Sequence, residues 1–322
     1  MKDFLAAAGR ARWPLPVLLA LGFAFTVAAQ FLPILNGYTQ FVMITVGVNI
    51  ILCVSLNLVN GYMGEFSVGH AGFMSLGAYA SAILTTKWLA GSPAAFPLAI
   101  LFGGSVAAAI GFLLALLSFK TRGDYLAIIT LAFLMIVKST WENLSFVGGP
   151  RGMTPPPLTT LPVVFVAVVA TLWIIRNLVY SKFGRAVIAI REDEIAANAM
   201  GVRVREAKIL AFVVSSFFGG VAGALFAHAN YFINPGQFDI VKSTEILVMV
   251  YLGGIGSLAG SILGAVIFTI LSQALQPLGT WRMVILPLML VLLMLFRPRG
   301  ILGLRELTWF LPKRELFTRR QP

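Results

Sequence analysis

The chain has 322 residues, of which 59% are hydrophobic and only 11% charged, and its mean hydropathy is +0.91. Soluble domains are about half apolar and about a quarter charged, so this composition excludes a soluble protein and predicts an all-α, polytopic bundle of membrane helices. A net charge of +12 would suit a nucleic-acid binder. Most basic residues lie between apolar runs, however, where they set orientation in a membrane, so no nucleic-acid partner is expected. Cys53 is the only cysteine, which excludes an internal disulfide or a cysteine-based metal site.

Apolar runs predict the membrane spans, because each full crossing needs about 20 such residues. The runs cover residues 14–35, 40–59, 72–90, 94–118, 124–140, 162–180, 209–230, 244–275 and 283–296. We therefore expect one transmembrane domain over residues 1–322, with about 8 full spans plus a glycine-broken hairpin, or about 8–10 transmembrane helices. No small-residue cleavage site follows the first run, so we expect a retained helix and not a signal peptide.

Basic residues between the runs predict the orientation, because Lys and Arg concentrate on the cytoplasmic side. They gather in residues 1–13, 119–124, the loop 181–208 and the tail 297–322. This distribution places both termini in the cytoplasm and requires the segment 244–275 to begin and end outside. We expect that segment to form a hairpin or re-entrant pair that bends at its glycine-rich centre. An outer loop at about 141–161 contains a proline run at 155–157, which excludes helix there.

The segment 57–72 interrupts the apolar pattern without any Lys, Arg or Pro. Irregular backbone at membrane depth is tolerated only where protein buries it or a water-filled cavity lies beside it, so the segment predicts part of a translocation path. Candidate path residues are Asn57, Asn60, Glu65, Ser67 and His70, and the glycines that would break the helix are Gly61, Gly64, Gly69 and Gly72. The alternative is a tight, glycine-packed turn at the membrane surface, with Glu65 in water. One His and one Glu are too few ligands, so no metal site is expected.

A second glycine-rich break is predicted within the segment 244–275. Its glycines are Gly253, Gly254, Gly256 and Gly260. Both breaks follow an inward run and precede an outward one, so residues 14–118 and 209–296 share a topology that hints at a parallel repeat. The same glycine spacing is also typical of plain helix packing. His228 and Asn230 lie at the outer end of the run 209–230.

The loop 181–208 carries a pattern typical of a docking helix. Acidic residues at 192–194 suit a helix N-terminus, small residues follow, and Gly201 is a favoured C-cap. A cytoplasmic helix over 185–201 that presents small side chains can seat in a groove of another protein. The candidate coupling residues are Arg185, Glu192, Glu194, Ala196, Ala197 and Gly201. The alternative is an ordinary amphipathic loop helix.

Several segments resemble one known family. Glu194, Ala196, Ala197 and Gly201 are similar to the Glu-Ala-Ala…Gly coupling motif of bacterial ABC importer permeases, with Ile195 inserted before the alanine pair. The wider run 184–212 and the segments 60–62, 69–73, 148–152 and 253–257 resemble the branched-chain amino acid permease family, and more closely the M-type subunit of its high-affinity system. These motifs occur in order over most of the chain from about residue 45 to about residue 300.

This resemblance implies half of a heterodimeric permease in the bacterial inner membrane, within an ATP-binding cassette importer for branched-chain or other hydrophobic amino acids. The implied partners are a second homologous permease subunit, two cytoplasmic ATPase subunits that dock on the loop 181–208, a periplasmic binding protein and the lipid bilayer. His228 and Asn230, at the outer end of their run, could meet that binding protein. The chain has no Gly-x-x-x-x-Gly-Lys-Ser/Thr loop, so we expect no cofactor, no ATPase site and no catalytic residue of its own.

Three alternatives stay open at this point. A permease for urea or short amides would share the scaffold. An ion-driven secondary transporter would also lack a phosphate-binding loop, although no Asp or Glu lies in the middle of an apolar run. A membrane-embedded enzyme is disfavoured, because two widely spaced histidines without an acidic cluster cannot assemble a catalytic site.

Overall fold

The structure is a computed structural model that describes residues 14–31, 36–88, 96–119, 125–281 and 300–303, with single positions between 284 and 295. Its α-helices are α2 (Pro14–Phe31), α3 (Gly37–Asn57), α4 (His70–Ile83), α5 (Phe96–Ser118), α6 (Tyr125–Asn143), α7 (Leu161–Val179), α8 (Lys182–Glu192), α9 (Glu194–Ala199), α10 (Val204–Asn230), α11 (Ile240–Gly253) and α12 (Leu258–Ala274). π-helical turns continue α3 over Leu58–Met63 and α4 over Leu84–Trp88. Short 3-10 turns lie at Ser145–Val147, Gly149–Arg151, Pro235–Gln237 and Gln276–Trp281.

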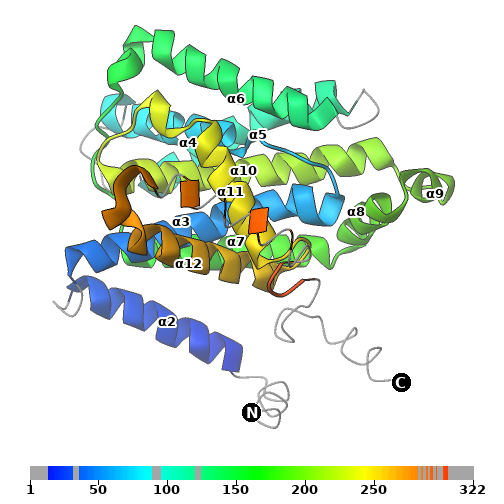
Figure 1. Cartoon of the computed structure of the whole chain (residues 1–322), viewed down its shortest axis with the longest axis horizontal. Helices are drawn as coiled ribbons and strands as arrows, with labels where there is room; N and C mark the ends of the chain where they lie inside the picture. Colours follow the sequence, from blue (N-terminus) through cyan, green and yellow to red (C-terminus); the bar gives the residue numbers. More distant parts are fainter. Residues whose placement is uncertain are drawn as a thin grey trace.

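The long helices run side by side, with α10 through the middle of the bundle, α6 along one edge and α2 along the other (Figure 1). The helices α8 and α9 project together at one end. Within the described residues the one extended pairing is an isolated bridge between Met153 and Ile233. The described part of the chain is therefore all-α, as the composition predicts.

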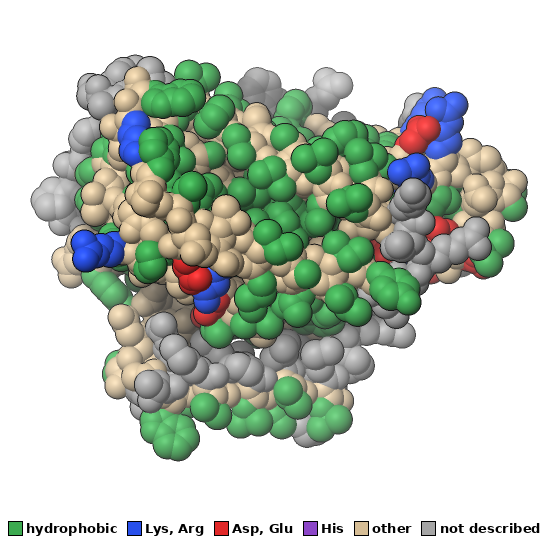
Figure 2. Space-filling model, turned by 90° about the horizontal axis from the view of Figure 1, so that it is seen from above, with side chains coloured by type: hydrophobic (Ala, Val, Ile, Leu, Met, Phe, Trp, Pro, Cys, Tyr) green, Lys and Arg blue, Asp and Glu red, His purple; other side chains and the backbone are tan. Residues whose placement is uncertain are grey.

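Five of the described helical segments are long and apolar enough to cross a membrane: Gly37–Met63, Phe96–Ser118, Tyr125–Asn143, Leu161–Val179 and Val204–Asn230. Two shorter apolar helices, Ala20–Gln30 and Leu258–Ala274, accompany them. Hydrophobic side chains cover the broad middle of the face seen in Figure 2, whereas most charged ones lie toward its two ends. An apolar belt between charged ends is the surface that a membrane bundle needs.

Small residues let α10 approach α4 and α5 closely. A Cβ added at Gly77 of α4 would overlap the backbone of Gly220 in α10, and one at Gly103 of α5 would lie 2.7 Å from the carbonyl oxygen of Gly77. Close backbone contact of this kind is the usual basis of helix association in membranes, where no hydrophobic force drives helices together. Large side chains fill the space around the contact, with Phe73 and Tyr79 fully buried.

The segment 244–275 forms the predicted hairpin. The helices α11 and α12 are separated by the break at 254–257 and pack against each other, since Gly253 touches Gly260 and the carbonyl of Met249 touches Gly264. The bend at the glycines is thus confirmed. The first arm begins at Ile240, four residues earlier than its apolar run, because the Asp239 side chain caps it by accepting from the N–H groups of Val241 and Lys242.

Other predicted segments fall partly outside the described residues. Residues 154–160 have no regular secondary structure, in line with the proline run. The basic segments 1–13, 120–124 and 304–322, on which much of the predicted orientation depends, lie outside the described residues. The last predicted span, 283–296, is described only at single positions.

Candidate functional site

The two glycine-rich breaks meet each other inside the bundle. Asn57, at the end of α3 and fully buried, donates to the carbonyl of Ser257 at 2.9 Å and to the hydroxyl of Ser261 at 2.7 Å. Its carbonyl oxygen accepts from the backbone N–H of Gly256 at 2.9 Å. One amide side chain therefore binds both the N–H of Gly256 within the second break and the first turn of α12 that follows it.

The break glycines allow this close contact. A Cβ at Gly61 would overlap the backbone nitrogen of Gly256, and one at Gly69 would overlap the carbonyl of Thr130. Gly72 faces Phe133, and Gly260 faces Gly253 and Gly254. Gly64 has a φ of +78°, a left-handed conformation that ends the π-helical turn Leu58–Met63. The irregular segment is therefore shorter than the predicted 57–72: helix continues to Met63 and resumes at His70.

Four of the five predicted path residues are buried and hydrogen-bonded within the chain. The side chain of Asn57 connects the two breaks. The side chain of Asn60 stabilises the first break by accepting from the N–H of Ser67 at 3.2 Å. The ring of His70 lies 2.8 Å from the hydroxyl of Ser55 in α3. Glu65 lines the cavity described below. Most of these residues therefore stabilise the first break through hydrogen bonds within the chain. Their contact with a transported solute stays a prediction.

The loop 181–208 folds into a helical hairpin instead of one helix. Ser181 caps α8 by accepting from Gly184 N–H at 3.2 Å, and Asp193 caps α9 by accepting from the N–H groups of Ile195 and Ala196, both at 2.9 Å. The single helix predicted over 185–201 is wrong in this respect, because the extended backbone at Asp193 separates α8 from α9. Gly201, with φ +82°, follows α9 as predicted for its C-cap.

The α8–α9 hairpin presents apolar side chains to its surroundings. Ile195 is 83% exposed and Met200 is 85% exposed, at the two ends of α9. Ala196 is exposed between them, whereas Ala197 is buried against the rest of the chain. Arg185 and Glu192 are also exposed. An exposed apolar residue in α9, Ile195, and another directly after its end, Met200, suit contact with another protein.

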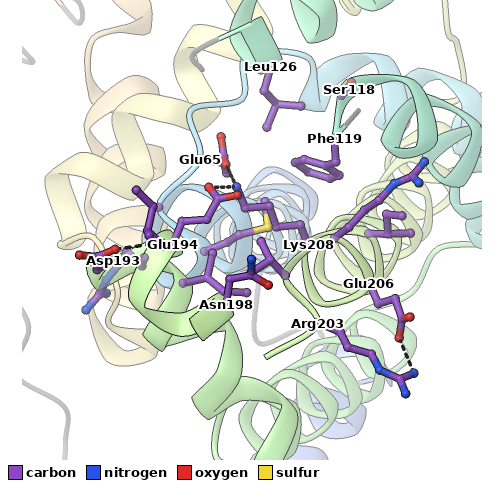
Figure 3. A pocket seen from close by; sticks show the side chains of 18 of the residues that line it. Glu65, Ser118, Phe119, Leu126, Asp193, Glu194, Asn198, Arg203, Glu206 and Lys208 are labelled. Carbon is purple, nitrogen blue, oxygen red and sulfur yellow. Dashed lines mark hydrogen bonds and ion pairs between the residues drawn. The ribbon is translucent and has the colours of Figure 1, made fainter. Parts of the chain in front are cut away.

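A cavity of 1290 Å³ lies between the hairpin, the first break and the start of α10. At its centre the ammonium group of Lys208 binds two carboxylates, Glu65 at 2.6 Å and Glu194 at 2.7 Å (Figure 3). The wall also holds Arg203 and Glu206, which pair with each other at 3.4 Å. The cavity therefore brings together Glu65 from the predicted path and Glu194 from the predicted coupling motif.

Arg191 makes a second contact between the hairpin and the first break. Its guanidinium donates to the carbonyl of Gly61 at 3.0 Å and also binds Glu192. Its stem lies against Gly64, where a Cβ would come within 2.6 Å of the Arg191 Cγ. The last turn of α8 is thus seated directly on the break.

Reasoning from the sequence missed Lys208 and Arg191 as site residues. Both lie in the basic loop 181–208, where the orientation of the protein in the membrane already accounts for a positive charge. The partners of Lys208 are Glu65 and Glu194, which lie 143 and 14 residues away in the sequence. No local sequence pattern predicts such a pairing. Glu245 lies in the second turn of α11, partly buried and paired with Lys242 at 3.1 Å, at the beginning and not in the middle of the apolar run 244–275.

His228 is buried at the end of α10 distant from the hairpin. Its ring contacts the hydroxyl of Thr85 at 2.9 Å and the carbonyl of Ala224 at 2.8 Å, and it packs on Phe96. Asn230 is partly buried and donates to the carbonyl of Phe226 at 3.2 Å. His228 therefore joins helices in this structure, which leaves little of its ring for a binding protein. Among the described residues no group of three His, Cys, Asp or Glu could hold a metal ion.

The apolar helices define a multi-pass membrane protein, and helices interrupted inside the bundle are a feature that many transporters share. The sequence also matches the family described as branched-chain amino acid transport system / permease component, over residues 38–295. The chain belongs to this family.

Individual relatives agree with this assignment. The chain is 35% identical over 289 residues to the high-affinity branched-chain amino acid transport system permease protein LivM of Escherichia coli (strain K12), covering 79% of this chain and 67% of that protein. It is 34% identical over 147 residues to the LivH permease protein of the same strain, covering 45% and 46%. It is 29% identical over 194 residues to a probable LivM of Methanocaldococcus jannaschii, covering 56% of each. No solved structure gave a significant match.

Proposed function

We propose that this chain is a permease subunit of an ATP-binding cassette importer that carries branched-chain and other hydrophobic amino acids into the cell. The family supports the class of transporter, and the names of its relatives support the substrate. The observation that carries the mechanism is the α8–α9 hairpin, which projects from one end of the bundle and is joined to the first break by Lys208 and Arg191.

The membrane arrangement is part of the proposal. The bundle has about 8 full spans plus the α11–α12 hairpin, in the inner membrane of a bacterium, with both termini and the α8–α9 hairpin in the cytoplasm. The basic residues of the loop 181–208 support this orientation. Cysteine-accessibility labelling of single-cysteine variants at positions 3, 185 and 320 checks it, and reaction from the outside at any of them contradicts it.

The partners are proposed from the same chemistry. A second homologous permease completes the path, and two cytoplasmic ATPase subunits bind the hairpin through Ile195, Ala196 and Met200. A periplasmic binding protein delivers the amino acid on the other side. ATP is bound and hydrolysed by the partner subunits, so this chain needs no cofactor of its own. Closure of the ATPase subunits moves the hairpin, and the helices rock between outward-open and inward-open states.

Uptake by the assembled transporter tests the function. Both permeases and the ATPase subunits are reconstituted in liposomes with ATP inside, and the binding protein is added outside. We expect uptake of radiolabelled leucine, isoleucine and valine that requires ATP and the binding protein. Uptake of urea or acetamide in place of these amino acids would reassign the substrate. Uptake that follows an ion gradient without ATP would overturn the class.

Docking on the hairpin is tested by Ile195→Asp. The side chain is 83% exposed, so the substitution leaves the fold of the chain intact but places a charge in the proposed apolar contact. We expect the ATPase subunits to be lost when the permease is purified, whereas Ile195→Met, which keeps an apolar side chain, retains them. Equal recovery of ATPase with both variants would show that α9 is not the docking element.

A further inference from the structure

Lys208 occupies an unusual position for a lysine in this chain. Its side chain is only 9% exposed, in the second turn of α10, where it faces Glu65 and Glu194 at salt-bridge distance (Figure 3). An ammonium group has three donors and can satisfy both carboxylates at once. The two carboxylates come from different elements: Glu65 from the irregular segment between α3 and α4, and Glu194 from the first turn of α9.

The two halves of this ionic link differ in their exposure to water. The Glu65 side chain is 20% exposed, whereas that of Glu194 is 55% exposed. Water screens the more exposed pair and weakens it, so the bond to Glu194 is the one that opens first. Breaking the inner pair would leave a buried charge uncompensated, which is much more costly.

The exposed half of the link lies beside the proposed docking surface. Glu194 directly precedes Ile195, and α9 has only six residues, too few to be stable without contacts to the rest of the chain. A displacement of α9 therefore acts on Glu194 at once. The Arg191 contact differs, because it joins the last turn of α8 to a backbone carbonyl and stays with α8.

The inner ion pair, between Lys208 and Glu65, connects to the non-helical segment between α3 and α4. Glu65 lies one residue after Gly64, in the non-helical segment that joins the π-helical end of α3 to the start of α4. A shift of this segment changes how the two helices meet. Lys208 itself belongs to α10, which packs against both of them.

We propose that Lys208 is a positioning residue for transport, one whose two ion pairs connect the α8–α9 hairpin to the first break. While both pairs hold, a displacement of α9 acts through Glu194 and Lys208 on Glu65, so the movement of the hairpin is passed to the break. Opening of the more exposed Glu194 pair uncouples the two. The inference rests on the proposed function, in which ATPase subunits act on the hairpin. The inference adds Lys208 as the residue that transmits the movement of the hairpin to the first break.

The test uses the complete transporter in lipid nanodiscs, with ATPase activity measured with and without amino-acid-loaded binding protein. The readout is the ratio of stimulated to basal activity, which a merely structural role would not change in a properly assembled complex. Glu194→Gln and Lys208→Met each remove one side of the outer pair. We expect each to lower the ratio by at least about fivefold, the lower range of typical coupling between sites. Glu206→Gln, which alters another carboxylate of the same cavity, should leave the ratio unchanged.

The double variant Glu194→Gln/Lys208→Met distinguishes a link from two separate effects. If the two residues act through one pair, the double variant is no worse than Lys208→Met alone. Effects that multiply, or a Glu194→Gln ratio equal to that of Glu206→Gln, would overturn the proposal. If Lys208→Met fails to assemble, the exposed Glu194→Gln still decides, by comparison with Glu206→Gln. Absence of any stimulation in the unmodified transporter would instead count against the proposed function itself.

Discussion

Asn57 joins the two breaks through hydrogen bonds to Gly256, Ser257 and Ser261. A buried backbone N–H or C=O group at an interrupted helix cannot bind water, so its hydrogen-bond partner must come from elsewhere in the chain. The arrangement explains why a polar side chain is fully buried at this point. It also means that the two irregular segments form one structural unit, although they are about 200 residues apart.

Replacement of Asn57 by Ala should destabilise the protein by about 2 kcal/mol or more, because the buried N–H of Gly256 loses its acceptor. We expect the midpoint of thermal unfolding in detergent to fall by about 5 °C. Asn143→Ala is the matched control, since its side chain bonds only within the exposed end of α6. Equal unfolding midpoints for the two variants would show that the bridge contributes little.

At the scale of the elements, the α8–α9 hairpin depends on its caps. A helix of six residues gains little from its own hydrogen bonds, so the two bonds from Asp193 to Ile195 and Ala196 are a large part of its stability. Ala197, on the buried face of the helix, and the pair of Glu194 with Lys208 provide its other attachments. An element held by so few contacts is easily displaced, and its displacement reaches α10 through the pair of Glu194 with Lys208.

Asp193→Ala should loosen α9 by about 1 kcal/mol, because it removes the side-chain acceptor at the N-cap. Hydrogen–deuterium exchange measures this at the amides of residues 195–197, which should exchange about fivefold faster. Asp193→Asn keeps an oxygen in the same place and should exchange at nearly the original rate. The cap has no such role if both variants exchange alike.

The sequence allowed the elements to be predicted better than their contacts. The bend of the α11–α12 hairpin, the helix break near Gly64 and the helical loop near Glu194 follow from glycine content, charge and local periodicity. The division of that loop at Asp193 was not predicted. An acidic residue suits both the first turn of a helix and the N-cap that separates two helices, so the sequence does not distinguish these positions. The pairing of Lys208 with Glu65 depends on the tertiary fold, which no local pattern encodes.

At the scale of the whole molecule, α10 connects the features that matter for function. It packs on α3, α4 and α5 within the bundle and carries Lys208 at the end near the hairpin. The apolar surface seen on the face in Figure 2 offers no hydrophobic gain for helix association, since lipid is as apolar as the protein. The bundle must therefore be held by close packing of small residues and by the buried polar contacts of the breaks.

Gly77→Ala tests this view of the bundle. The added methyl group would overlap the backbone of Gly220 in α10, and a backbone cannot move aside as a flexible side chain can. The substitution should force α4 and α10 apart and cost about 3 kcal/mol, the upper range for overpacking in a core. Gly37→Ala is the control, because nothing lies within 4 Å of its added Cβ. We expect Gly77→Ala to unfold at a clearly lower temperature than Gly37→Ala. If both unfold alike, the helices tolerate separation, and the polar bridges at the breaks must hold the bundle without the glycine contact.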